Sequence, residues 1–239
     1  LCALTVPLFV FTRSMAARNR AMNVETAEAW YRSGQEQLKA GRTAEAIDLF
    51  RKAATNDHGN PEYTLALATA LAESDHTREA RQILLRLRMS TPESGEVNLN
   101  LARLNAKEAM RVEAVRYYRN ALYGVWPPAQ STKQRLAVRG ELIRFLLAAH
   151  DSSQALSELL ILASDIPDTE KAHLELGQLF SEAADAHHAL EQFTLALEMN
   201  ANSAEALRGA GRASFDLGNF TSAQKYLQSA ADNGDKSEP

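Results

Sequence analysis

The sequence lacks the cysteines of disulfide-stabilised or cysteine-ligated folds. It also lacks the excess of basic residues that is typical of nucleic-acid-binding folds. Its single cysteine, Cys2, cannot form an intramolecular disulfide, and a zinc site with four cysteine ligands is excluded. Basic residues are not in excess, because 26 Lys and Arg stand against 30 Asp and Glu, which gives a net charge of −4. No overall field therefore attracts phosphate backbones, and we expect no nucleic-acid partner.

Most prolines lie between the apolar segments that have helical spacing, and no strand pattern is visible. Five of the seven prolines fall between apolar runs that have helical spacing. They are Pro61, Pro92, Pro127, Pro128 and Pro167. Since proline breaks a helix interior, this distribution predicts that the long segments are helices. With 45% hydrophobic residues, the chain can also bury a substantial core.

The amino terminus differs from the rest of the chain. Residues 1–12 carry no charge and are followed by Arg13, Arg18 and Arg20. Twelve residues are shorter than the roughly 20 that span a bilayer. Because the chain does not begin with methionine, we interpret this run as the last part of a truncated membrane-spanning helix. The alternatives are the end of a signal sequence or a short buried segment.

The three arginines favour a basic juxtamembrane linker, residues 13–26, with the rest of the chain on the cytoplasmic side. An exported, for example periplasmic, location is the alternative.

A repeat runs through the remaining sequence. Small residues pair at a separation of 12 positions: Gly34/Ala46, Ala68/Ala80, Ala102/Ala114, Gly177/Ala189 and Gly211/Ala223, with Ile143/Ala155 keeping only its second small member. Large residues follow 16 positions after the first of each pair: Phe50, Leu84, Tyr118, Leu159, Phe193 and Leu227. The units start at 27, 61, 95, 136, 170 and 204. We expect two antiparallel helices in each unit, with small residues allowing close backbone approach.

The first unit, residues 27–53, resembles a tetratricopeptide repeat. The family's signature columns are occupied by Trp30, Gly34, Gly41, Ala46, Phe50 and Ala53. Residues 170–199 and 204–231 match nearly as well, and the resemblance covers about 205 residues. It implies an all-α, right-handed superhelical solenoid of six helix pairs over residues 27–231, followed by a polar tail, residues 232–239.

The fourth unit departs from the pattern. Seven extra residues, 129–135, precede it. Because seven residues are close to two helical turns, we predict a lengthened first helix rather than a loop. Ile143 replaces a small residue, which predicts local splaying of this unit. At the turn within each unit, glycine is kept only at Gly41 and Gly218, with Asp75, Ala109, His150 and Ala184 elsewhere.

The concave face formed by the first helices is the expected binding surface. Its candidate residues occupy the fifth and ninth positions of the units: Tyr31, Gln35, Leu65, Leu99, Arg103, Arg144, Leu174, Gln178, Arg208 and Arg212. Tyr31, Leu65 and Leu99 suggest an apolar track, and Arg103, Arg144 and Arg212 a basic one. Such a groove suits a peptide or helix with apolar and acidic residues. Alternatively, the leucines pack against neighbouring units and the arginines are solvated.

The family's carboxylate clamp is absent from this groove. In cochaperones that bind chaperone carboxyl termini, basic residues and asparagines form that clamp. The matching positions of the first three units hold Tyr31, Gln35, Ala66, Glu96 and Asn100.

No constellation of residues indicates catalysis, a cofactor or a metal. The pair His187-His188 is interpreted as a solvated surface, because adjacent residues point to different sides of a helix. The segment Gly209–Ser214 imitates part of a dinucleotide fingerprint, but no strand precedes it.

We therefore expect a non-enzymatic scaffold that binds another protein, attached to a membrane by its amino terminus and able to self-associate. The alternatives are a regulatory or docking segment of a longer enzyme and, more weakly, an RNA-binding repeat.

Overall fold

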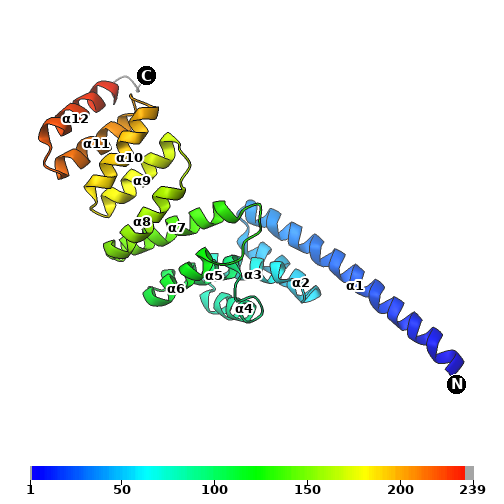
Figure 1. The fold of residues 1–239 in the computed structure, drawn as a ribbon. Coiled ribbons are helices and arrows are strands. Elements are labelled where there is room, and N and C mark those ends of the chain that lie inside the picture. Colours follow the sequence, from blue (N-terminus) through cyan, green and yellow to red (C-terminus); the bar gives the residue numbers. More distant parts are fainter. Residues whose placement is uncertain (1, 235–239) are drawn as a thin grey trace. The chain divides into compact units, whose positions relative to one another are not determined.

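The computed structural model describes residues 2–234, and every regular element in this part of the chain is an α-helix (Figure 1). In chain order the helices are α1 (Cys2–Lys39), α2 (Thr43–Asn56), α3 (Pro61–Glu73), α4 (Thr77–Ser90), α5 (Gly95–Lys107), α6 (Arg111–Leu122), α7 (Ser131–Ala148), α8 (Ser152–Asp165), α9 (Glu170–Glu182), α10 (Ala186–Met199), α11 (Ala204–Asp216) and α12 (Phe220–Gly234). The predicted all-α solenoid of helix pairs is confirmed. Of the predicted polar tail, residues 235–239 lie outside the described part.

Four of the six predicted unit starts coincide with helix starts, because local signals place them. The helices α3, α5, α9 and α11 begin at residues 61, 95, 170 and 204, four of the six starts expected from the repeat. Their N-cap side chains accept hydrogen bonds from the first turn: Asn60 from Glu62 N, Ser94 from Val97 N, Thr169 from Ala172 N and Ser203 from Ala206 N. Such caps satisfy backbone donors that have no partner within the helix.

The turns inside the helix pairs follow the repeat as well. Gly41 and Gly218 have φ angles of 75° and 76°, and the four non-glycine residues at the same column share this conformation. These are Asp75, Ala109, His150 and Ala184, with φ between 56° and 64°. A residue in the left-handed region at a helix end closes the last turn by backbone hydrogen bonds, as from Arg42 N to Gln37 O.

The amino-terminal helix α1 is continuous from Cys2 to Lys39, so the predicted linker, residues 13–26, is helical and joins the first helix of unit one. Its last turns pack against α2. No helix in the described residues is long and apolar enough to cross a membrane. The expected membrane span is thus unsupported.

The fourth unit has the predicted lengthened first helix: α7 contains 18 residues, against 13 in α3, α5, α9 and α11. Just before it, the chain divides into two compact units, residues 1–126 and 127–239. We call them unit N and unit C. In each, helices that follow one another in the chain pack together, and α3 also contacts α5 as α9 contacts α11.

Small residues allow this packing. All eleven small residues of the repeat pairs are buried: Gly34, Ala46, Ala68, Ala80, Ala102, Ala114, Ala155, Gly177, Ala189, Gly211 and Ala223. A Cβ at Gly34 would lie 2.6 Å from Cε1 of Phe50, and one at Gly177 would lie 2.9 Å from Cε1 of Phe193. The ring of the second helix therefore occupies the space that glycine leaves on the first.

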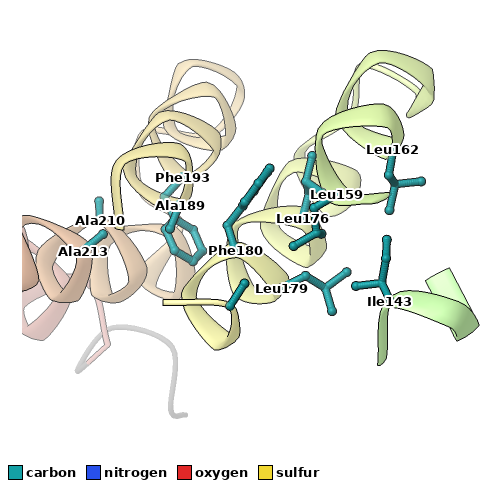
Figure 2. Packing of buried hydrophobic residues seen from close by; sticks show 11 residues of the cluster. Ile143, Leu159, Leu162, Leu176, Leu179, Phe180, Ala189, Phe193, Ala210 and Ala213 are labelled. Atoms are coloured by element: carbon teal, nitrogen blue, oxygen red, sulfur yellow. The ribbon is translucent and has the colours of Figure 1, made fainter. Parts of the chain in front are cut away.

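The core of unit C runs through successive helices (Figure 2). Ile143 of α7 packs with Leu159 and Leu162 of α8, and the row continues through Phe180 and Phe193 toward α11. Ile143 is fully buried although it replaces a small residue. Within unit C, successive helices pack least closely between α8 and α9.

Candidate functional site

The candidate groove residues of unit N do not form an open apolar track. Leu99 is only 6% exposed and belongs to the buried core, so the expectation that it faces a partner is wrong. Tyr31 and Leu65 are half-buried. The Tyr31 hydroxyl donates a hydrogen bond of 2.8 Å to Glu62 Oε1 on α3.

Hydrogen bonds of the same kind link other neighbouring first helices. Thr69 on α3 donates to Asn100 Oδ1 on α5 at 3.1 Å, and Gln178 on α9 donates to Glu205 on α11. Tyr31 and Gln178 were expected to face a partner. Instead, part of their polar capacity joins adjacent first helices, since the fifth and ninth positions lie beside the next unit.

The arginines of the predicted basic track differ in their surroundings. Arg103 lies in unit N, whereas Arg144 and Arg212 lie in unit C, as does the further candidate Arg208. Arg212 Nε lies 3.6 Å from Asp216 Oδ1, one turn further along α11. Arg144 is exposed and has no ion pair among the described residues. Leu174 is half-buried against the core of unit C and offers little free surface.

A cleft lies beside Arg144, between α7, α8 and α9. Its volume is about 380 Å³, it is open to solvent on one side, and all of its lining residues belong to unit C. The lining residues are Leu136, Ala137, Gly140, Arg144, Leu162, Ile166, Pro167, Thr169, Lys171, Ala172, Glu175, Leu176 and Leu179. We call it the α7–α9 cleft. An apolar lining with a few polar groups is typical of a binding site.

Three local features keep this cleft open. Gly140 has no side chain, and a Cβ built there would meet only Nη1 of Arg144, at 3.5 Å. The loose packing of α8 on α9 separates the two helices. Pro167 lies in the connection between them, where it cannot continue α8.

The charge of the cleft is positive at one side. Lys171 Nζ lies 3.8 Å from Glu175 Oε1, but the two side chains are 86% and 57% exposed, so this pair contributes little. Arg144 then supplies an available cation beside apolar surface. Its planar guanidinium suits a carboxylate, which it can bind through two parallel hydrogen bonds.

A second cleft, of about 600 Å³, lies in unit N between α2, α3 and α4. Although it is larger, its lining is more polar, and one of its two arginines, Arg51, already pairs with Glu79 at 2.9 Å and with Asp48 at 3.5 Å. We therefore favour the α7–α9 cleft as the candidate site. The sequence pointed to Arg144 but missed the cleft, whose lining comes largely from α7 and α9 and is completed by the α8–α9 connection.

Two sequence profiles of the tetratricopeptide repeat match the chain, over residues 37–104 and 174–238. The chain belongs to the tetratricopeptide repeat (TPR) family. As a TPR protein it has the architecture of a protein-interaction scaffold. No curated protein matches the sequence significantly.

Solved TPR structures share its fold. PilF of Pseudomonas aeruginosa is 19% identical with a TM-score of 0.61, over 86% of this chain and 91% of that one. The C-terminal part of a TPR protein from Cytophaga hutchinsonii is 17% identical with a TM-score of 0.66, over 85% and 78%. YrrB, a TPR protein with an unusual peptide-binding site, is 17% identical with a TM-score of 0.56, over 77% and 91%. Identities this low show the fold alone.

Proposed function

We propose that this TPR protein binds a peptide or helical segment of another protein in the α7–α9 cleft. The observation that carries the proposal is an exposed, unpaired Arg144 beside the apolar lining of that cleft. The partner segment then has apolar side chains that fill the cleft and a carboxylate that pairs with Arg144. YrrB, a TPR protein of similar fold, has an unusual peptide-binding site, which supports the proposal.

Photo-crosslinking in the native cell tests the proposal. A photoreactive amino acid at Ala137, which is exposed and lines the cleft, is expected to capture a distinct protein. The same probe at Gln224, which is exposed on α12 outside the cleft, is the control. Identical capture at both positions would contradict the proposal, and capture of this chain alone would indicate self-assembly instead.

Matched variants then assign the capture to the cleft. Arg144→Glu reverses the charge beside the cleft and is expected to lower capture at least tenfold, since a charged hydrogen bond contributes about 1.5–3 kcal/mol. Arg208→Glu makes the same change at an exposed arginine that does not line the cleft, and should leave capture unchanged. Equal effects of the two variants would indicate general electrostatics rather than a site.

We further propose that the amino-terminal segment attaches the protein to a membrane, with the repeats on the cytoplasmic side. The uncharged run of residues 1–12 and the arginines after it support this idea. The chain is expected to co-sediment with vesicles containing anionic lipid, and Leu8→Asp together with Val10→Asp should abolish this. Wild-type protein that stays in the supernatant would contradict membrane attachment.

A further inference from the structure

Three side chains that can bind a metal gather at the start of α10. The donor atoms of His187, His188 and Glu191 all lie within 4.8 Å of one another. The sequence suggested that the two histidines point apart, yet their rings meet edge to face with centroids 5.6 Å apart. Glu191 lies four positions after His187, so these two residues share one face of the helix.

His188 is held in place by two contacts. Its Nδ1 lies 2.7 Å from Oδ2 of Asp185, and its ring stacks on Phe180 at a centroid distance of 5.1 Å. Phe180 is fully buried, so it supplies a rigid support. With Nδ1 engaged by the carboxylate, Nε2 remains the nitrogen that can bind an ion. A carboxylate behind a histidine is the usual arrangement around metal-bound imidazole.

The other two ligands can adjust to an ion. His187 and Glu191 are exposed, and their side chains can move without disturbing the core. A tetrahedral zinc ion needs nitrogen and oxygen donors at about 2.0–2.2 Å, which requires only a modest approach from the present positions. The positive end of α10 opposes a cation there, but the carboxylates of Asp185 and Glu191 offset it.

We propose that His187, His188 and Glu191 form a zinc-binding site in which Asp185 positions His188. Two imidazole nitrogens and one carboxylate oxygen are a donor set that zinc prefers. Water takes the fourth position. This site is independent of the α7–α9 cleft, because none of its residues lines that cleft.

Calorimetric titration of the tag-free full chain with ZnCl₂ tests the proposal, with Co²⁺ absorption as a second probe of tetrahedral geometry. One ion is expected to bind per chain. His188→Ala and Glu191→Gln each remove a ligand and should weaken zinc binding at least tenfold. His76→Ala removes an exposed histidine of unit N and should change nothing. No saturable binding, or equal binding by wild type and His188→Ala, would overturn the proposal.

Asp185→Asn separates the positioning role from a structural one. Asp185 also caps α10 by accepting a hydrogen bond from His188 N, and asparagine caps a helix about equally well. The variant should therefore keep its thermal stability without metal. Its zinc affinity should fall about 10- to 100-fold, as when other carboxylates behind a metal-bound histidine are removed. Unchanged affinity would show that Asp185 has only the capping role.

Discussion

At the scale of single residues, the ring of Phe50 explains why position 34 is a glycine. Its missing side chain leaves the space that Phe50 fills, with 2.6 Å between an added Cβ and Phe50 Cε1. Phe50 is buried and contacts Tyr31, with ring centroids 5.7 Å apart, so its ring cannot easily retreat. The same relation between Gly177 and Phe193 shows that the two columns of the repeat depend on each other.

We predict that Gly34→Leu lowers the free energy of unfolding by about 1–3 kcal/mol, the typical cost of overpacking a core. Urea denaturation measures the effect. Gly140→Ala is the control, because its new Cβ meets only Arg144 Nη1 at 3.5 Å and alanine favours a helix by roughly 1 kcal/mol. A Gly34→Leu variant as stable as wild type would show that Phe50 relaxes freely.

Backbone strain in the turns within the helix pairs also lowers stability at single residues. Ala109 adopts a φ of 57°, a conformation that strains residues with a Cβ by roughly 1–2 kcal/mol. Allowing for the greater freedom of glycine in the unfolded chain, Ala109→Gly should raise the free energy of unfolding by about 0.5–1 kcal/mol. Ala29→Gly, at an exposed position inside α1, should lower it by roughly 1 kcal/mol. Thermal melts compare the pair, and a loss in both variants would contradict the strain argument.

At the scale of helices, side chains on first helices hold neighbouring units in register. The Tyr31 hydroxyl on α1 donates to Glu62 on α3, and Tyr31 also packs against Tyr63, with ring centroids 4.9 Å apart. Burial, followed by the hydrogen bond to Glu62, raises the pKa of Tyr31 to about 12. This contact therefore depends on the phenol staying protonated.

A raised pKa in the folded state gives a definite pH dependence. An unfolded tyrosine ionises near pH 10, before the folded one does, so the contribution of Tyr31 is complete below about pH 10 and is lost as the pH rises through about 12. We predict that the stability difference between wild type and Tyr31→Phe shrinks from pH 9 to pH 12. Urea denaturation at several pH values measures it, and a constant difference would contradict the Tyr31–Glu62 contact.

The segment after α6 is fastened to the start of α5. Val125 N donates to Glu93 O at 2.7 Å, Gly95 N donates to Val125 O at 2.9 Å, and the Trp126 indole donates to Ala121 O at 2.8 Å. A Cβ at Gly95 would lie 2.2 Å from Trp126, so the indole rests directly on the α5 backbone. This contact fixes the end of unit N.

We predict that Trp126→Ala lowers the free energy of unfolding of unit N by about 3–5 kcal/mol, the usual cost of removing a buried tryptophan. Tyr123→Ala, at a largely exposed neighbour, should cost far less. Both are measured by circular dichroism in urea. Similar losses in the two variants would show that the indole is not a specific anchor.

At the scale of the whole molecule, each unit contains buried clusters of its own. One cluster of unit C joins buried residues between 143 and 213, and clusters built on Phe50 and Tyr63 lie in unit N. Repeat arrays gain stability from contacts between neighbouring repeats. A destabilising substitution is therefore expected to act mostly on the unit in which it lies.

Both tryptophans, Trp30 and Trp126, lie in unit N, so their fluorescence reports on that unit alone. We predict that Phe180→Ala, in the core of unit C, moves part of the circular dichroism transition to lower denaturant while the fluorescence midpoint stays unchanged. Phe50→Ala should move the fluorescence midpoint. A shift of the fluorescence midpoint by Phe180→Ala would show that the units unfold as one.

The repeat could be recognised in the sequence because each of its recurring positions makes a local contact. A glycine or alanine at the eighth position, a ring or leucine at the twenty-fourth, and a turn residue between them specify a helix pair whatever surrounds it. The starts of α3, α5, α9 and α11, the six turn positions and the lengthened α7 all follow from such local rules.

The exposure of individual side chains and the distances between them could not be predicted from the sequence in the same way. They depend on which other parts of the fold lie nearby. Tertiary packing buried Leu99, opened the cleft beside Arg144 and turned His188 toward Asp185. The sequence by itself thus determined the helix pairs and their periodic packing. Only the tertiary structure decided which side chains remain available to a partner or an ion, since that depends on the non-repeating connections and on imperfect contacts between successive pairs.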